Sequence, residues 1–502
     1  MLFNSAAFLF VFLPVVLSGY FLVLRYLGKL PSQLWLFVSS LFFYGWWNPV
    51  YVTLIIASML FNFYLGRYLL MKQDKKALIV GIAANLAVLG YYKYTGLLVA
   101  TANQLSGADF IIPNIILPLG ISFFTFQKIA FLVDCHRKLA SPNQSLVNFG
   151  LFITFFPQLI AGPIVHHKEM MPQFARPQPF SGSNFAVGLT LRSIGLFKKV
   201  MIADTLDAYA NPLFKLAETR ELHIIEAWTA ALCYTFQIYF DFSGYSDMAL
   251  GIGKMFNVRL PVNFFSPYKS KNIIDFWRRW HMTLSRFLRD YLYIPLGGNR
   301  KGSARRYVNL LITMLLGGFW HGANWTFLIW GGMHGIFLGI NHWWQKAGLF
   351  NIHPYAARVM TFLSVMVAWV FFRANDMHTA ISVVKSLGDI TSLQGQGLHA
   401  ALLSRTAVLR ATFEAPDANL VCLLIPICFI ICWALPNTIE IMRKGRPCIG
   451  STRGLALSQN IVGRALLWRP ALATGIIGGL ILSICIAKVI YEPSQVFLYF
   501  QF

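Results

Sequence analysis

Long apolar runs are the feature of this sequence that most constrains its fold. Runs such as 6–24, 77–97 and 471–490 approach or reach the roughly 20 residues that a helix needs to cross a bilayer. A bilayer offers no water to backbone N–H and C=O groups, so each run must satisfy its own hydrogen bonds, as a helix does. Hydrophobic residues make up 57% of the 502 residues and charged residues only 12%, too few to cover a soluble surface. We therefore predict an all-α, polytopic membrane protein rather than a soluble enzyme, a disordered chain or a disulfide scaffold.

The apolar runs predict about 11–13 membrane segments in one domain covering 1–502. Proline and glycine interrupt several runs, for example at Leu117–Gly120, Phe156–Pro157 and Gly317–Gly318. Irregular backbone at membrane depth is tolerated where it is buried in protein or lines a cavity. We therefore expect short, broken and interfacial helices around a water-accessible central tunnel.

The net charge of +23 fits the lysine and arginine bias of cytoplasmic loops, so we expect no nucleic-acid partner. The first basic residues, Arg25 and Lys29, follow the apolar run 6–24 instead of preceding it. This order predicts a retained helix whose N-terminus faces away from the cytoplasm. By the same rule, the neutral segment 385–417 is expected outside and the basic segment 437–469 inside.

Positive charge is concentrated between Lys254 and Arg306, where twelve lysines or arginines accompany only two acids. Topology alone rarely needs this density, so anionic lipid headgroups or an anionic soluble substrate are expected partners. Within this segment, Pro295–Lys301 is a glycine-rich basic loop that can contact phosphates, although it is not a Walker A motif.

Two histidines are candidates for chemistry. His321 follows a very apolar run, and an ionisable group at membrane depth is costly and commonly functional. Its reference pKa near 6.5 suits a general base, although a hydrogen bond between helices is the alternative. His281 lies where the apolar and cationic faces of a predicted amphipathic helix, 272–293, meet. Such a helix could lie at the cytoplasmic membrane surface, with the histidine either incidental or functional.

Other polar groups receive structural interpretations. His334 lies 13 residues after His321, about 220° around a continuous helix, and is expected to point away from it. Asp241 and Asp247 are interpreted as a helix-breaking polar bend, and 166–169 as a solvated loop. We expect no disulfide and no metal cluster, because the seven cysteines are odd in number and form no C-x-x-C pair.

Several long motifs resemble those of the membrane-bound O-acyltransferase family, and within it the bacterial alginate O-acetylation type. The resemblance runs from the N-terminus to about residue 345, with a core near 110–345, and includes the C-terminal tail. The motifs are Pro157–Pro163, Tyr239–Ala249, Phe276–Ser285, Leu288–Arg300, Leu315–Trp325 and Phe497–Phe502.

The resemblance implies a tunnel with a catalytic histidine at its centre, which matches His321, and a second histidine, which matches His281. It also implies a bacterial inner-membrane protein, here with a periplasmic N-terminus. Such proteins pass acetyl groups from a cytoplasmic donor to polysaccharide hydroxyls, often through a periplasmic esterase-like partner. We expect acetyl-CoA as a donor substrate and no tightly bound cofactor. The side chains expected to hold the donor are Arg278, Arg279, Arg289, Asn299, Arg300 and Lys301.

Three alternatives stay open at this point. Peptidoglycan could replace an alginate-like polysaccharide as the acceptor, and a carrier-protein donor would give a D-alanyl transferase. A transporter or polysaccharide flippase would also use broken helices, but it should keep its function after His321→Ala. The sequence has no Gly-x-Ser-x-Gly elbow, so we expect no serine acyl-enzyme.

Overall fold

The structure is a computed structural model that describes all residues except 114, 143–144, 349, 394–417, 451–462, 464, 493–496 and 499–502. Its first helices are α1 (Leu13–Tyr26), α2 (Lys29–Gly45), α3 (Val50–Lys72), α4 (Lys75–Ser106), α5 (Ile121–His136), α6 (Leu146–Thr154), α7 (Phe156–Leu159), α8 (His167–Ala175), α9 (Gly182–Phe197) and α10 (Asp204–Ala217). The later ones are α11 (Ile224–Met255), α12 (Ile273–Trp277), α13 (Met282–Leu288), α14 (Gly302–His321), α15 (Trp325–Ala347), α16 (Pro354–Arg373), α17 (Met377–Leu387), α19 (Ala418–Trp433), α20 (Thr438–Ile441) and α22 (Leu472–Tyr491). Short π or 3₁₀ segments are η1 (Phe8–Phe12), η2 (Lys198–Ala203), η3 (Pro267–Lys269), η4 (Arg289–Tyr293), η5 (Ile390–Leu393) and η6 (Arg443–Gly445).

The predicted all-α class is confirmed, because the described residues form helices and no strand. Five of these helices are long and apolar enough to cross a membrane, namely Phe8–Tyr26, Val50–Lys72, Lys75–Ser106, Pro354–Arg373 and Leu472–Tyr491. Two of the three predicted breaks cited above are also present. Gly120, with φ of 71°, precedes the first residue of α5, and Phe155 separates α6 from α7.

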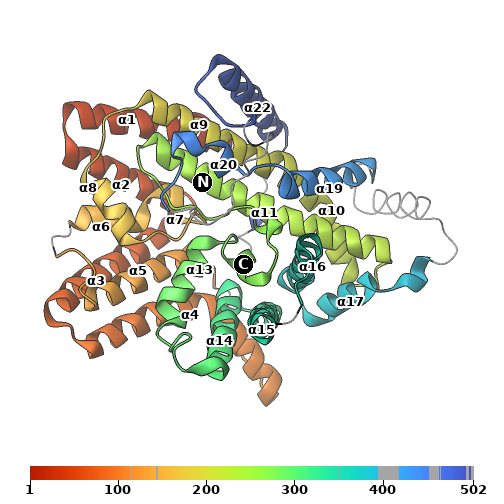
Figure 1. Cartoon of the computed structure of the whole chain (residues 1–502). Coiled ribbons are helices and arrows are strands. Elements are labelled where there is room, and N and C mark those ends of the chain that lie inside the picture. Colours follow the sequence, from red (N-terminus) through yellow and green to blue (C-terminus); the bar gives the residue numbers. More distant parts are fainter. Residues whose placement is uncertain are drawn as a thin grey trace.

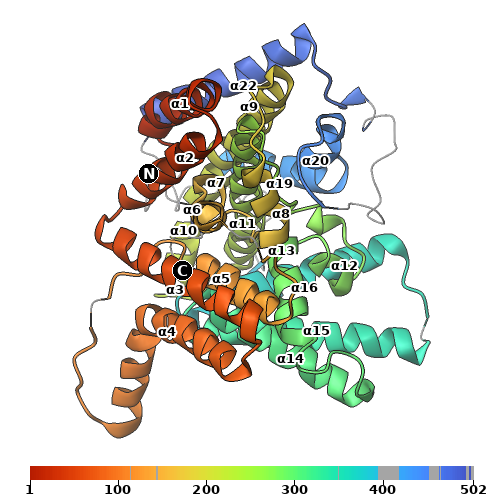
Figure 2. The ribbon, with the colours of Figure 1, turned by 90° about the vertical axis from the view of Figure 1, so that its left-hand side faces the viewer.

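The long helix α11 occupies the middle of the molecule, and α9 packs along it (Figures 1 and 2). Two glycine pairs make this close approach possible. A Cβ on Gly188 would lie 2.5 Å from the carbonyl oxygen of Gly251, and a Cβ on Gly195 would lie 2.5 Å from that of Gly244. Larger side chains would force the two backbones apart.

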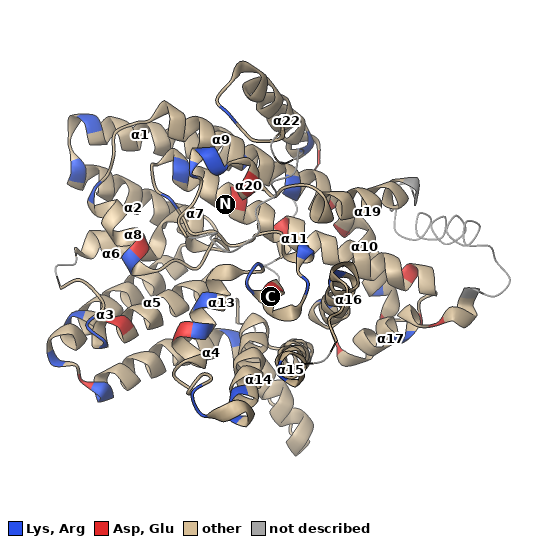
Figure 3. Cartoon of the chain, viewed as in Figure 1, with Lys and Arg blue, Asp and Glu red and all other residues tan. Residues whose placement is uncertain are grey.

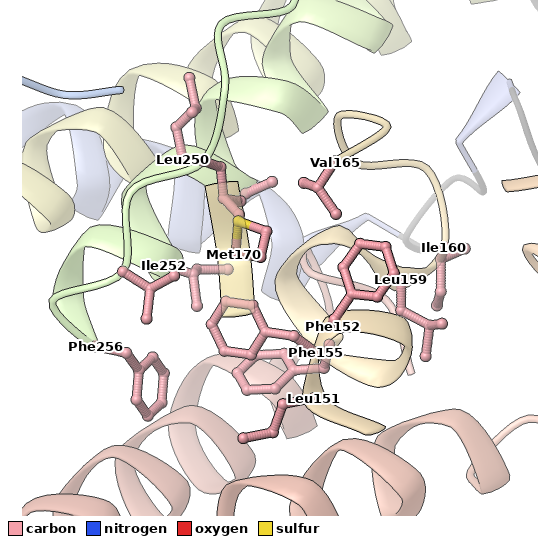
Figure 4. Packing of buried hydrophobic residues seen from close by; sticks show 14 of the residues in the cluster. Leu151, Phe152, Phe155, Leu159, Ile160, Val165, Met170, Leu250, Ile252 and Phe256 are labelled. Atoms are coloured by element: carbon pink, nitrogen blue, oxygen red, sulfur yellow. The ribbon is translucent and has the colours of Figure 1, made fainter. Parts of the chain in front are cut away.

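Apolar packing joins this centre to the broken segments that precede α8. Figure 4 shows Phe152, Phe155 and Leu159 close to Met170 of α8, with Leu250 of α11 and Phe256, which directly follows α11, in the same cluster. The irregular backbone around α7 is therefore buried in protein, as irregular backbone at membrane depth must be.

Both ends of the chain reach α11. The ring of Phe3 stacks on Tyr245 with centroids 4.9 Å apart, and Phe497 contacts the same tyrosine edge-on at 4.8 Å. The N–H of Leu498 donates a hydrogen bond to Oδ2 of Asp241 (3.2 Å). Phe497 and Leu498 of the tail thus lie beside α11, in the middle of the molecule.

The structure describes only part of the two predicted loops, 385–417 and 437–469. Residues 394–417 of the expected external segment, and 451–462 and 464 of the expected cytoplasmic one, lie outside the described residues. The first expected loop begins inside α17, and the second contains α20 and η6.

Candidate active site

The stretch 272–293 is not one amphipathic helix, contrary to our prediction. Helix α12 ends at Trp277, α13 begins at Met282, and His281 between them has left-handed backbone angles (φ 42°, ψ 53°). The segment beside Asn263 supplies the hydrogen bonds that a continuous helix would have made. The N–H of Met282 donates to the carbonyl of Asn263 (2.9 Å), and the N–H of Phe265 donates to that of Arg279 (2.9 Å). A non-glycine residue held in this conformation is typical of functional sites.

The break buries His281, which is 1% exposed, instead of leaving it at a membrane surface. Its Nδ1 lies 3.1 Å from Oδ1 of Asn263, an atom that also accepts from the N–H of Thr283 (3.3 Å). A backbone N–H can only donate, so this side of the amide must be its oxygen, and Nδ1 of His281 must carry the proton. The neutral ring therefore has its lone pair on Nε2, which has no hydrogen-bond partner among the described residues.

His321 is the last residue of α14 and is 6% exposed. Aromatic rings surround its imidazole edge-on, with centroids at 4.7 Å for Trp320, 5.2 Å for Trp330 and 5.1 Å for Phe372. Helices α14 and α15 approach closely here, since a Cβ on Gly318 would overlap the carbonyl oxygen of Phe327. The predicted break at Gly317–Gly318 is therefore wrong: both glycines lie inside α14, and Gly318 allows the two helices to pack.

His281 and His321 line the same buried chamber, which the structure forms from elements distant in sequence. Its volume is about 20 Å³, room for about one water molecule. The other lining residues are Ile238, Asp241, Phe242, Trp280, Trp369, Phe372 and Leu498. Two imidazoles in a mainly aromatic, water-poor chamber can exchange protons with a bound hydroxyl.

A second cavity of about 680 Å³ lies on the other side of the 277–283 segment. Trp277, Met282 and Thr283 line this cavity, whereas Trp280 and His281 line the chamber. The two cavities share no lining residue. The segment that carries His281 thus separates the large cavity from the histidine chamber.

Four arginines line the large cavity, namely Arg278, Arg286, Arg289 and Arg306. Arg286 forms a two-pronged ion pair with Glu169 (2.5 and 2.9 Å). Arg289 pairs with Asp290 at 2.7 Å, and this hydrogen bond raises the pKa of the guanidinium above its ordinary value. Arg278 and Arg306 have no acidic partner among the described residues. Figure 3 shows basic residues around α13 and at the beginning of α14.

The expected donor-binding residues divide into two groups in the structure. Arg278, Arg289 and Asn299 line the cavity, whereas Arg279, Arg300 and Lys301 do not. Arg279 instead donates to Asp275 (2.9 Å) and holds the end of α12. Arg286 and Arg306, which we did not single out, take part in the lining.

The sequence profile described as "MBOAT, membrane-bound O-acyltransferase family" matches residues 9–374. The chain belongs to this family. It is a multi-pass membrane acyltransferase, so the transporter alternative is set aside.

Similar proteins are named for the transfer of acetyl or D-alanyl groups. A peptidoglycan O-acetyltransferase of Helicobacter pylori is 45% identical over 77% of this chain and 80% of its own. A probable alginate O-acetylase of Pseudomonas putida is 37% identical over 100% of both chains. A teichoic acid D-alanyltransferase of Bacillus subtilis is 28% identical over 46% of this chain and 61% of its own.

The expected polar bend in the acyltransferase is a regular part of α11. Asp241 accepts from Lys199 (2.6 Å), and Asp247 accepts from Lys198 (2.6 Å). The ion pairs to η2 keep these carboxylates inside the helical core, so a bend is not needed to expose them to water.

The continuous-helix argument that placed His334 does not apply, because α14 and α15 are separate helices. His334 does not line the histidine chamber. Its Nδ1 accepts from Nε1 of Trp277 (3.3 Å), and its ring lies 4.8 Å from that of Trp330, which also contacts His321. This hydrogen bond fits the structural role that we expected.

His166 and His167 do not form a solvated loop. They stand at the N-terminus of α8, and both Nε2 atoms contact Oδ2 of Asp134, at 2.8 and 3.0 Å. Nδ1 of His166 accepts the N–H of Lys168 (3.3 Å), which favours a proton on its Nε2, the atom that faces Asp134. The cluster is thus a hydrogen-bonded junction of α5 and α8, to which Tyr291 adds a third donor (3.0 Å).

Sequence reasoning missed two residues beside the histidines. Asn263 carries no motif that would have revealed its role. Lys93 did carry a signal, because it is an ionisable residue inside the apolar run 77–97, a position that marks functional candidates.

Proposed function

We propose that this acyltransferase moves an acetyl group from cytoplasmic acetyl-CoA across the bacterial inner membrane to a hydroxyl group of a cell-surface glycan. The main support is that His281 and His321 line one buried chamber next to an arginine-lined cavity. The charge of the loops supports a periplasmic N-terminus. The acceptor is the glycan itself or a periplasmic esterase-like partner that passes the group on.

The large cavity suits the donor. Arg278 and Arg306, which no acid neutralises among the described residues, would bind the phosphates of CoA. From there the pantetheine arm would pass the 277–283 segment to bring the thioester to the chamber. Residues of this segment line both cavities, so the segment lies on the path of the arm.

His321 would act as the general base. It takes the proton of the acceptor hydroxyl while the oxygen attacks the thioester carbonyl. Collapse of the tetrahedral intermediate expels the CoA thiolate, which takes the proton back from the imidazolium. The dry aromatic chamber suppresses hydrolysis of the thioester.

His281 would orient the acceptor. Since Asn263 holds the proton on Nδ1, Nε2 of the neutral ring can only accept a hydrogen bond. A hydroxyl can donate such a bond, whereas a thioester carbonyl cannot. The tautomer therefore favours contact with the hydroxyl over contact with the thioester.

The glycan class has two candidates. The 45% identity to a peptidoglycan O-acetyltransferase favours peptidoglycan, and the full-length similarity to a probable alginate O-acetylase favours an alginate-like polysaccharide. Both share the chemistry of a sugar hydroxyl accepting an acetyl group.

The test is purified protein in nanodiscs with radiolabelled acetyl-CoA and membrane extract. Wild type should release CoA and transfer label, and His321→Ala should lose nearly all of this activity. His353→Ala, which changes an exposed histidine before α16, is the matched control and should behave as wild type. No CoA release by folded wild type would contradict acetyl-CoA as the donor.

A further inference from the structure

The C-terminal end of α14, which carries His321, is closed by side chains of another helix. The last four carbonyl groups of an α-helix have no partner within the helix. In α14, Gly322 follows directly with extended backbone angles (φ −158°, ψ 154°), so no left-handed glycine turn caps this end. The carbonyls must therefore find donors elsewhere.

Helix α4 supplies these donors. Nζ of Lys93 donates to the carbonyl oxygens of Trp320 (2.6 Å) and His321 (2.7 Å). The hydroxyl of the next residue, Tyr94, donates to the carbonyl of Phe319 (2.9 Å). Three of the four terminal carbonyls are thus bonded by two consecutive residues that lie more than 220 positions away in sequence.

Aromatic and cation–π contacts also hold α4 against the C-terminal end of α14. The ring of Tyr94 stacks on Phe319 with centroids 4.2 Å apart and planes at 8°. Nζ of Lys93 lies 5.9 Å from the centre of the Trp320 ring, a distance at which a cation is attracted to the ring face. The positive charge also lies at the negative end of the α14 dipole.

We propose that Lys93 and Tyr94 are positioning residues that hold His321 in its reactive place. A half-buried cation inside an apolar helix is costly, and here its hydrogen bonds go to the carbonyls of Trp320 and of His321, the histidine of the chamber. Neither residue lines the chamber, so both act through the end of α14. The inference rests on the proposed function only in its catalytic readout.

The first readout is kinetic. Lys93→Met removes the donors and keeps the chain length, and it should lower kcat by up to about 100-fold, the usual effect of a misplacement near 1 Å. The KM for acetyl-CoA should stay within about twofold, because the donor cavity is untouched. Tyr94→Phe keeps the stack and loses one bond, so its loss of kcat should be smaller, and Lys93→Arg should restore part of the activity lost in Lys93→Met.

The matched control is Tyr91→Phe, a change of an exposed tyrosine on the same helix, which should leave kcat unchanged. The second readout is amide hydrogen exchange of the peptide that covers 315–322. It should speed up in Lys93→Met and stay as wild type in Tyr91→Phe, whether or not acetyl-CoA is the donor.

The two readouts separate the two hypotheses. If wild type is inactive and Lys93→Met still exchanges faster, the proposed donor is contradicted, but the positioning role of Lys93 is supported. A folded Lys93→Met variant with wild-type kcat, or with wild-type exchange in 315–322, would contradict the proposal that Lys93 positions His321.

Discussion

Nδ1 of His281 lies 3.1 Å from Oδ1 of Asn263, and this contact decides which nitrogen of the imidazole carries the proton. The same oxygen accepts from Oγ1 of Thr283 (2.9 Å), so it also ties the first turn of α13 to the segment before η3. The side-chain amide of Asn263 thus sets the tautomer of the histidine and also binds the first turn of α13.

We expect Asn263→Ala to lower kcat for CoA release by about tenfold or more, because a freed imidazole loses its orientation. The buried Nδ1–H would also be left without its partner, which destabilises the protein by about 1–3 kcal/mol. Ser246→Ala is the matched control, since it removes the other contact of Asn263, at Nδ2 (3.3 Å), and leaves Oδ1 in place. Equal losses of kcat in the two variants would contradict the orienting role.

Arg278→Gln and Arg306→Gln should each raise the KM for acetyl-CoA by about tenfold, the effect of losing one charge-assisted hydrogen bond. The kcat should change little, because the phosphates lie away from the reacting atoms and bind equally in ground and transition state. Steady-state kinetics at two salt concentrations measure this, and the effect should shrink at high salt. Arg300→Gln and Lys301→Gln, outside the cavity lining, are the controls. A comparable rise in KM in these controls would place the donor elsewhere.

Gly318→Ala should destabilise the contact of α14 with α15 by about 1–3 kcal/mol, as overpacking does. The new Cβ would overlap the carbonyl oxygen of Phe327, and backbone cannot move aside cheaply. In the control Gly332→Ala, the Cβ would meet Cδ2 of Leu315 at 3.4 Å, an ordinary contact. Thermal unfolding of detergent-solubilised protein gives the comparison. Similar midpoints for the two variants would refute this account of the glycine.

The sequence by itself determined the class of this protein. Apolar runs of bilayer length permit only helices, because backbone groups in lipid must bond within their own segment. His321 was also a candidate from sequence alone, since an ionisable residue in an apolar run is conspicuous and its motif is contiguous. These features are local in sequence, so they can be recognised without knowledge of the fold.

Only the tertiary structure decided where His281 lies. The helical wheel assumed a continuous helix over 272–293, but hydrogen bonds from the Asn263 segment interrupt it and turn His281 into the interior. The same assumption of a continuous helix fails for His334, because α14 and α15 are separate helices.

The fold also decided which charges act together. The sequence does not distinguish the twelve basic residues between 254 and 306 by function. In the structure, Arg279 forms an ion pair with Asp275, whereas Arg278 lines the cavity. Lys93 meets His321 from 228 residues away. Partners at such separations are brought together by packing, and no local pattern of residues encodes that distance.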